Sequence, residues 1–260
     1  MLNLVQTELL VMFIFMSGCF LLALTIKRND IADVVWGPIF IIAVITALIT
    51  VGLYSDRTLL ASALVFIWGG RLAIRILLRN LKKKTEDFRY QEWREQWGKH
   101  FYLRTFFQVF MLQGFLALVV VSPVSMIIAS YNPPLNLLDY LGLAIWLAGF
   151  FFESVGDYQL DLFKNDPANR GRIMQTGLWR YSRHPNYFGE VSMWWGIYLI
   201  ALSVPFGYLS FIGPLTITFL ILKVSGIPML EKRYADNSAF QAYARRTNAF
   251  FPLPPKPEDK

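Results

Sequence analysis

Seven ionisable side chains interrupt long apolar runs of this sequence: Asp33, Arg71, Arg75, Glu153, Asp157, Glu190 and Lys223. A charge inside a membrane-spanning segment is costly, so each is a candidate functional group. The planar donor fork of arginine suits phosphate groups, whereas carboxylates suit amine groups and ribose hydroxyls. The set predicts a polar cavity for a phosphate-bearing ligand. The alternative is structural ion pairing, with arginines that extend to lipid head groups.

The spacing of these charges predicts two helical stripes. Arg71 and Arg75 are four residues apart, as are Glu153 and Asp157, so each pair lies on one face of a helix. A basic and an acidic stripe at the same depth could either neutralise each other or line one cavity.

A second group of candidates lies in a polar segment that precedes an apolar run. Residues 165–172 are rich in turn-forming residues, and Pro185 suits the first turn of a helix. Arg183 and His184 lie directly before that helix, with hydroxyl groups and aromatic rings nearby. Such a collection at a helix N-terminus favours an anionic ligand with a flat ring. A basic interfacial loop anchored by aromatic side chains is the alternative.

The elements that must position these residues are membrane-spanning helices. The chain has 260 residues, of which 55% are hydrophobic and 17% are charged, and its mean hydropathy is +0.41. A span needs roughly 20 apolar residues. Seven runs qualify: Leu4–Ile26, Ile31–Tyr54, Thr58–Leu78, Thr105–Ser130, Leu135–Leu162, Asn186–Ser203 and Phe206–Met229. We therefore predict an all-α, polytopic membrane protein with seven transmembrane helices, the last two forming a tight hairpin.

The loops predict the orientation and the domain organisation. Basic residues fill alternate loops, and short basic loops stay in the cytoplasm, so the N-terminus is expected outside and the C-terminus inside. The same rule accounts for the net charge of +7 without a nucleic-acid partner. We expect a single membrane domain over residues 1–260, with helices 1–4 in 1–130, helices 5–7 in 131–251 and a flexible tail over 252–260. Cys19, the only cysteine, is expected to be packed or lipid-facing, and no metal site is expected.

The stretch 176–190, TGLWRYSRHPNYFGE, together with GDYQL at 156–160 and FKNDPAN at 163–169, resembles the C-terminal domain of the steroid 5α-reductase superfamily, in particular bacterial members of unassigned substrate. The resemblance is close over Asp157–Phe251 and weaker before it. It implies seven helices, NADPH bound from the cytoplasmic side and reduction of a polarised carbon–carbon double bond. By motif, it places cofactor contacts on Arg71, Asp157, Lys164, Tyr181, Asn186, Tyr187, Glu190, Tyr243 and Arg246; Arg75, Arg183 and His184 join them as basic neighbours.

The substrate side departs from the family pattern. Steroid-reducing relatives carry a glutamate on helix two and a tyrosine on helix three that hold the substrate carbonyl group, and neither occurs here at the matching place. Asp33 is the candidate replacement, as a catalytic proton donor that burial could keep protonated. Its alternative role is a helix N-cap. The substrate is therefore expected to be lipidic, but a steroid is not implied.

Two other functions remain open. Isoprenylcysteine and phospholipid methyltransferases share the Arg183–Gly189 pattern and bind S-adenosylmethionine, although residues 156–169 favour the reductase. A non-enzymatic, lipid-binding membrane protein is the third possibility. The expected partners are a lipidic small molecule and membrane lipids, with a bacterial inner membrane as the expected location.

Overall fold

The computed structural model describes residues 2–82 and 85–257, and in those residues it contains helices and loops but no strand. The chain forms two compact units. Unit 1 comprises residues 1–135 and 201–213, and unit 2 comprises residues 136–200 and 214–260. Each unit is described by itself.

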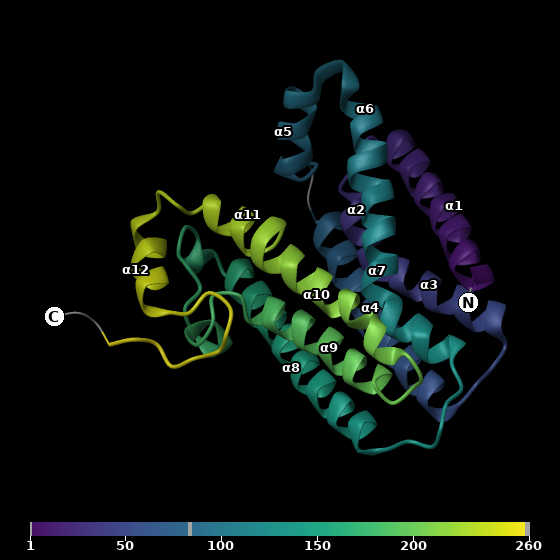
Figure 1. Cartoon of the computed structure of the whole chain (residues 1–260). Helices are drawn as coiled ribbons and strands as arrows, with labels where there is room; N and C mark the ends of the chain where they lie inside the picture. Colours follow the sequence, from purple (N-terminus) through teal and green to yellow (C-terminus); the bar gives the residue numbers. More distant parts are fainter. Residues whose placement is uncertain (1, 83–84, 258–260) are drawn as a thin grey trace. The chain divides into compact units, whose positions relative to one another are not determined.

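Unit 1 is a bundle of long helices (Figure 1). Its elements are α1 (Leu2–Ile26), α2 (Ile31–Val34), α3 (Trp36–Val51), α4 (Asp56–Leu81), α5 (Phe88–Trp97), α6 (Phe101–Arg104), the π-helical segment Thr105–Met111, α7 (Leu112–Ala129) and the 3₁₀ turn Gly207–Phe211. The core lies where α3 packs on α4, α7 and α1. Cys19 is buried on α1, as the sequence predicted.

The predicted span over residues 31–54 is wrong in its bounds, because the structure divides it at Val35 into α2 and α3. Pro38 explains the division. It is the third residue of α3 and has no amide hydrogen to donate to Val34, so an uninterrupted helix would lose a bond there. Helix α3 then packs tightly on α4, because a Cβ atom at Gly37 would lie 2.2 Å from the carbonyl oxygen of Gly69.

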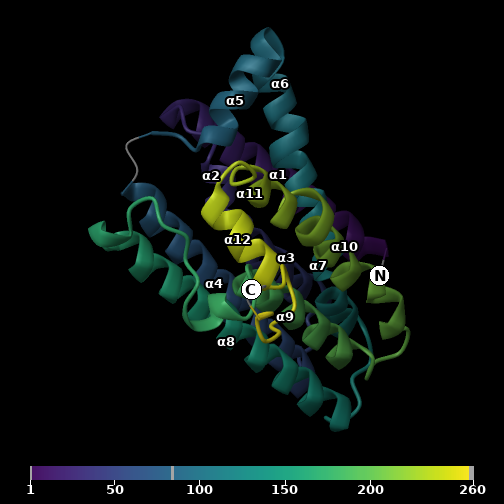
Figure 2. The ribbon, with the colours of Figure 1, turned by 90° about the vertical axis from the view of Figure 1, so that its left-hand side faces the viewer.

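Unit 2 contains α8 (Leu137–Asn165), the 3₁₀ turns Pro167–Asn169 and Gly177–Arg180, α9 (Pro185–Ala201), most of α10 (Ile212–Phe219), the π-helical segment Leu220–Val224, α11 (Ile227–Lys232) and α12 (Ser238–Arg246). Asn136 starts α8 with a capping box that includes Asp139. Helices α8 and α9 lie side by side in both views of the ribbon (Figures 1 and 2).

Five helical stretches of the described chain are long and apolar enough to cross a membrane: Leu2–Ile26, Asp56–Leu81, Arg89–Ala129, Leu137–Asn165 and Gly207–Lys232. Helix α3 is apolar but has 16 residues, and α9 has 17. The chain is therefore an all-helical protein with several membrane-spanning candidates. A seven-span topology with the N-terminus outside stays a prediction.

Two residues of the C-terminal tail form backbone hydrogen bonds with unit 2. The amide of Leu253 donates to the carbonyl oxygen of Tyr181 at 3.0 Å, and that of Lys256 donates to Arg246 at 2.9 Å. The flexibility of the tail over residues 252–260 stays a prediction. The proline-rich sequence runs extended along unit 2, where the amides between its prolines find acceptors.

Candidate functional site

Two pairs of glycines set the distance between α8 and α9. A Cβ atom at Gly149 would lie 2.6 Å from the carbonyl oxygen of Gly189, and one at Gly142 would lie 2.5 Å from that of Gly196. The two glycines of α8 are seven residues apart, as are the two glycines of α9. On each helix the two glycines therefore lie on one face, and these faces meet. Small residues at this spacing let the backbones of membrane helices approach closely.

This close approach brings together two of the predicted cofactor contacts. Asp157 is 2% exposed on α8, and its Oδ1 accepts a hydrogen bond of 3.1 Å from Nδ2 of Asn186 in the first turn of α9. The oxygen of the same amide group, Oδ1 of Asn186, is buried and has no donor among the described residues. A buried acceptor is seldom left without a donor, so this atom is suited to a ligand amide or hydroxyl group.

The loop before α9 is fixed to unit 2 by an ion-pair cluster. Arg183 donates to both carboxylate oxygens of Glu231, at 2.8 and 3.0 Å, and to the carbonyl oxygens of Ala244 and Thr247. Nε2 of His184 lies 3.0 Å from Oε1 of Glu231. The donors of Arg183 thus face the protein, and this side chain orders the loop. A direct contact from Arg183 to a cofactor stays a prediction without support from the geometry.

Tyr243 has a similar structural position. It is 5% exposed, and its hydroxyl group donates to the carbonyl oxygen of Trp179. Burial raises the pKa of Tyr243 above its ordinary value, so the hydroxyl group keeps its proton. Trp179 in turn donates from Nε1 to the carbonyl oxygen of Gly156 at 3.0 Å, which joins the loop to α8. These two bonds attach the loop that contains Trp179 to α12 and to α8.

A polar cavity of about 190 Å³ lies in unit 2 beside this loop region. Its lining residues are Gln175, Arg180, Tyr243, Arg246, Thr247 and Pro255. Ligand pockets for drug-sized molecules measure about 300–1,000 Å³, so this cavity is too small for a whole dinucleotide and is suited to one anionic group. Two guanidinium groups with an amide and a hydroxyl group nearby form a suitable set of donors for a phosphate. We name this feature the arginine cavity.

The other predicted cofactor contacts are distributed more widely. Lys164 is exposed near the end of α8, Tyr181 is 41% exposed, and Glu190 is partly buried on α9. Tyr187 stacks on His184, with ring centroids 5.5 Å apart and planes at 15°. In unit 1, Arg71 and Arg75 are partly buried one turn apart on α4, as their spacing predicted. It stays a prediction that Arg71 and Arg75 line one cavity with the predicted cofactor contacts of α8 and α9.

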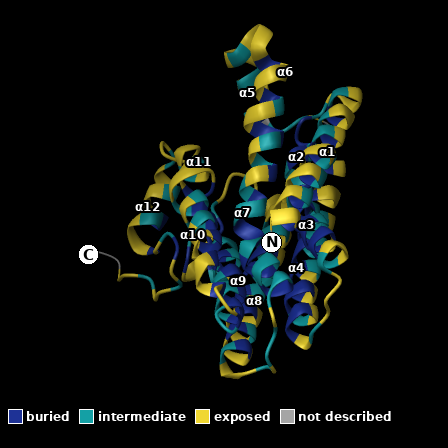
Figure 3. Ribbon diagram, turned by 45° about the vertical axis from the view of Figure 1, so that its right-hand side comes forward, coloured by how far each residue is buried: buried dark blue, intermediate teal, exposed yellow. Residues whose placement is uncertain are grey.

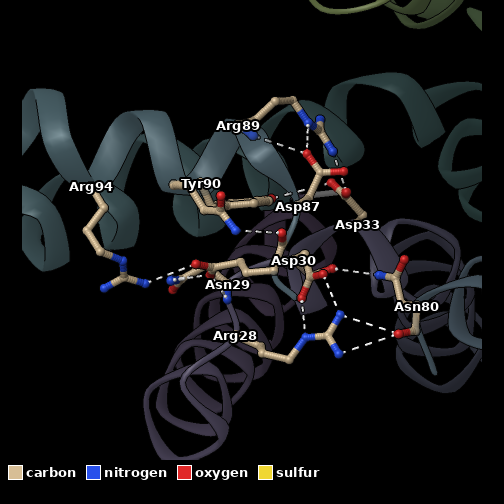
Figure 4. Close-up of polar contacts among 11 residues, drawn as sticks. Arg28, Asn29, Asp30, Asp33, Asn80, Asp87, Arg89, Tyr90 and Arg94 are labelled. Carbon is tan, nitrogen blue, oxygen red and sulfur yellow. Dashed lines mark hydrogen bonds and ion pairs between the residues drawn. The ribbon is translucent and has the colours of Figure 1, made fainter. Parts of the chain in front are cut away.

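A second polar cluster surrounds Asp33 in unit 1 and ties the α5 helix to the α1–α2 turn and to α4 (Figure 4). Arg89 donates to Oδ2 of Asp33 at 2.5 Å and to Oδ1 of Asp87 at 2.9 Å. The hydroxyl group of Tyr90, which is 1% exposed, lies 3.4 Å from the other oxygen of Asp33. We call these four residues the Asp33 cluster.

A neighbouring set of bonds extends the same attachment. Arg28 binds both carboxylate oxygens of Asp30, at 3.0 and 2.7 Å, and its guanidinium lies 3.4 Å from the carbonyl oxygen of Asn80 on α4. Glu86 accepts hydrogen bonds from Asn29 and Arg94. The loop from Arg28 to Asp33 therefore holds α4 and α5 through charged contacts.

This geometry bears on the predicted catalytic role of Asp33. The alternative role as an N-cap is not seen, because Asp33 is the third residue of α2 and Asp30 occupies the cap position without a side-chain bond. Burial raises the pKa of the Asp33 carboxyl group above its ordinary value, and the Arg89 guanidinium at 2.5 Å opposes that rise. The structure gives Asp33 a role in attaching α5; its role as a proton donor stays a prediction.

Comparison with known proteins identifies the family. A model of a family described as a protein of unknown function, DUF1295, matches residues 19–247. The chain belongs to this family. An uncharacterised protein of Schizosaccharomyces pombe is 26% identical over 166 residues, which is 56% of this chain and 48% of the relative. The chain thus spans about half the length of that curated relative. No solved structure matches.

Sequence reasoning missed several residues that the structure brings to these sites. Arg180 and Gln175 line the arginine cavity, Glu231 holds Arg183, and Arg89 and Tyr90 contact Asp33. Arg180 could have been found, because it lies inside the 176–190 stretch. Glu231, Arg89 and Tyr90 could not be found from the local sequence, since their partners are between 47 and 57 residues away.

Proposed function

We propose that this protein is an NADPH-dependent membrane oxidoreductase that reduces a polarised carbon–carbon double bond of a lipidic substrate. The observation that carries the proposal is the arginine cavity, which lies within the stretch that resembles the cofactor-binding region of steroid 5α-reductases. The matching family is associated with proteins of that type, which supports the assignment. When bound, the cofactor would supply the hydride, and the protein would supply binding, orientation and exclusion of water.

The chain offers distinct groups for the parts of such a ligand. Arg180 and Arg246 would hold a phosphate group, with Gln175 as an additional donor. Asp157 orients Asn186, whose buried Oδ1 would accept from an amide or hydroxyl group. Tyr243 and Arg183 keep the loop between these groups in place. Seven spans and a cytoplasmic C-terminus would place the whole region at the inner face of a bacterial inner membrane.

Purified protein in detergent provides the test. We expect NADPH to raise the unfolding temperature, because a ligand at 100 times its Kd stabilises the folded state by about 2.7 kcal/mol. Stabilisation by S-adenosylmethionine alone would replace the reductase by the methyltransferase alternative. No response to NADPH, NADH or S-adenosylmethionine would favour a non-enzymatic, lipid-binding protein.

Three arginine variants locate the cofactor. Arg180→Gln and Arg246→Gln each remove a cation from the arginine cavity, and a hydrogen bond to a charged group contributes about 1.5–3 kcal/mol. We expect each to weaken NADPH binding by about 10- to 150-fold. Arg245→Gln is the matched control, because Arg245 follows Tyr243 on the same helix and is exposed, as Arg246 is, but does not line the cavity. Equal losses from Arg245→Gln and Arg246→Gln would place the phosphate elsewhere.

A further inference from the structure

The segment that follows Phe251 is attached to unit 2 through its backbone. Residues 252–257, which we call the C-terminal strap, have the sequence Pro-Leu-Pro-Pro-Lys-Pro. Proline has no amide hydrogen, so Leu253 and Lys256 are the only backbone donors of the strap. The amide of Leu253 donates to the carbonyl oxygen of Tyr181 at 3.0 Å, and the amide of Lys256 donates to that of Arg246 at 2.9 Å. Every backbone donor of the strap is therefore used.

The two acceptors belong to the two segments that carry the cations of the arginine cavity. Tyr181 directly follows Arg180 in the loop before α9, and Arg246 is the last residue of α12. Pro255, which precedes the second anchor in the sequence, is itself a lining residue of the cavity. The strap thus joins, through one short piece of backbone, the two segments whose guanidinium groups would hold one phosphate.

The strap is held by these two bonds more than by packing. None of its six residues is buried, and Leu253 is 50% exposed (Figure 3). The chain just before it is better fixed, because Phe250 is 8% exposed and its carbonyl oxygen accepts a hydrogen bond of 2.8 Å from the Ser182 hydroxyl group. A segment with few buried contacts opens at a lower free energy than the whole fold. The strap is therefore able to leave its position while the rest of unit 2 stays folded.

Helix α12 and the loop are also joined on their buried side. The hydroxyl group of Tyr243, which is 5% exposed, donates to the carbonyl oxygen of Trp179. The side chains of Arg180 and Arg246 belong to exposed residues, and so does the Tyr181 anchor. The strap therefore adds a second connection on the exposed side, where it limits how far the two arginine-bearing segments separate.

A bound phosphate would connect the same two segments. When two links join the same pair of segments, each raises the effective concentration of the groups that form the other. This coupling is reciprocal, so the ligand stabilises the seated strap by the same factor by which the strap strengthens ligand binding. The four prolines restrict the backbone of the free strap, which lowers the entropy lost when it seats.

We propose that the C-terminal strap and a phosphate group bound in the arginine cavity stabilise each other, so that the strap regulates how tightly the cavity holds its ligand. The inference rests on the proposed function only in that the cavity must bind a phosphate group. The seated strap slows release of the ligand, because it keeps both guanidinium groups in one lining.

Hydrogen exchange measures the seating of the strap directly. The probe is inorganic phosphate, titrated at constant ionic strength, and fragmentation of the C-terminal peptide in the mass spectrometer reads the amides of Leu253 and Lys256. One ordinary hydrogen bond corresponds to a factor of about three to ten, so we expect saturating phosphate to slow exchange at both amides by about that factor. Arg246→Gln should abolish the effect, because it removes a guanidinium group and leaves the carbonyl acceptor. Arg245→Gln should preserve it.

A backbone variant tests the reverse direction of the coupling. Lys256→Pro and Lys256→Ala both remove the ammonium group, but only the first removes the amide donor. Lys256 precedes Pro257 and so already favours extended backbone, in which proline is accommodated. We expect Lys256→Pro to bind phosphate about three to ten times more weakly than Lys256→Ala. Leu253→Pro against Leu253→Ala repeats the comparison at the other anchor, and gel filtration checks that each variant is folded.

The outcomes separate this inference from the proposed function. Unchanged exchange with phosphate, equal slowing in Arg246→Gln, or equal phosphate affinity in the proline and alanine variants would each overturn the strap. If NADPH raises the unfolding temperature while exchange at the two amides stays the same, the strap is refuted and the reductase proposal stands. If phosphate slows exchange but NADPH neither binds nor slows it, the strap stands and the reductase proposal falls.

Discussion

The Asp33 cluster allows the sharpest prediction about stability. Arg89 binds Asp33 at 2.5 Å, and their side chains are 27% and 14% exposed. Arg89→Ala leaves the Asp33 carboxylate with the Tyr90 hydroxyl group at 3.4 Å as its remaining hydrogen-bond partner among the described residues. We expect this change to destabilise the protein more than either an exposed charge or a surface truncation would.

The magnitude follows from burial. Removal of one partner from a fully buried ion pair costs about 3–5 kcal/mol, because an uncompensated charge remains. Since water reaches part of Arg89, we expect about 2–3 kcal/mol for Arg89→Ala, below that range. Asp33→Asn should cost less, about 1–2 kcal/mol, because Arg89 keeps its contact with Asp87 at 2.9 Å.

The double variant Asp33→Asn/Arg89→Ala isolates the interaction itself. Its cost should be smaller than the sum of the single costs by about 1–2 kcal/mol, as expected for residues in direct contact. The assay is equilibrium unfolding in mixed detergent micelles, followed by tryptophan fluorescence, since Trp93 and Trp97 stack in the α5 region. Additive costs within about 0.5 kcal/mol would refute the reasoning, because they would mean that the pair is not coupled.

Three further changes test the packing. Gly149→Ala should lower the free energy of unfolding by about 1–3 kcal/mol in the same assay, because the new Cβ atom would lie 2.6 Å from a backbone oxygen of α9. Gly70→Ala is the control: its Cβ atom meets no atom within 4 Å, so this change should be neutral or stabilising. Tyr243→Phe should cost about 1–3 kcal/mol by leaving a buried carbonyl group without its donor, and Tyr234→Phe, at a more exposed position, should change the free energy of unfolding little. Ser125→Ala should cost about 1 kcal/mol through the lost bond to the buried carboxyl group of α1, and an unchanged thermal midpoint would contradict that bond.

The helices were largely predictable, because long apolar runs have few alternatives to a membrane helix. What the hydropathy pattern could not show is where a run breaks. Pro38 divides α2 from α3, and the segments Thr105–Met111 and Leu220–Val224 widen into π-helix, which depends on packing rather than composition. The polar helix α5 contains no apolar run that would predict it, and its attachment to α2 depends on residues distant in the sequence.

The sequence predicted which types of residue occur at the candidate site. It did not predict which of them bind other residues of the protein and which line a cavity. Arg183 and Arg180 have the same chemistry and lie three residues apart. Arg183 meets Glu231, 48 residues away, and becomes part of the scaffold, whereas Arg180 lines the arginine cavity. Local sequence cannot distinguish these outcomes, because the deciding partner comes from another element of the fold.

This division of the charges bears on ligand selection. Where each cation has a carboxylate at hydrogen-bond distance, as Arg183 and Arg89 do, an incoming phosphate must compete with a bound anion and gains little. Arg180 and Arg246 are both among the lining residues of the arginine cavity. Two guanidinium groups in one lining favour a ligand group that carries negative charge. The contrast between NADPH and S-adenosylmethionine thus rests on which end of each molecule enters this cavity, and the response of Arg180→Gln to each ligand measures it.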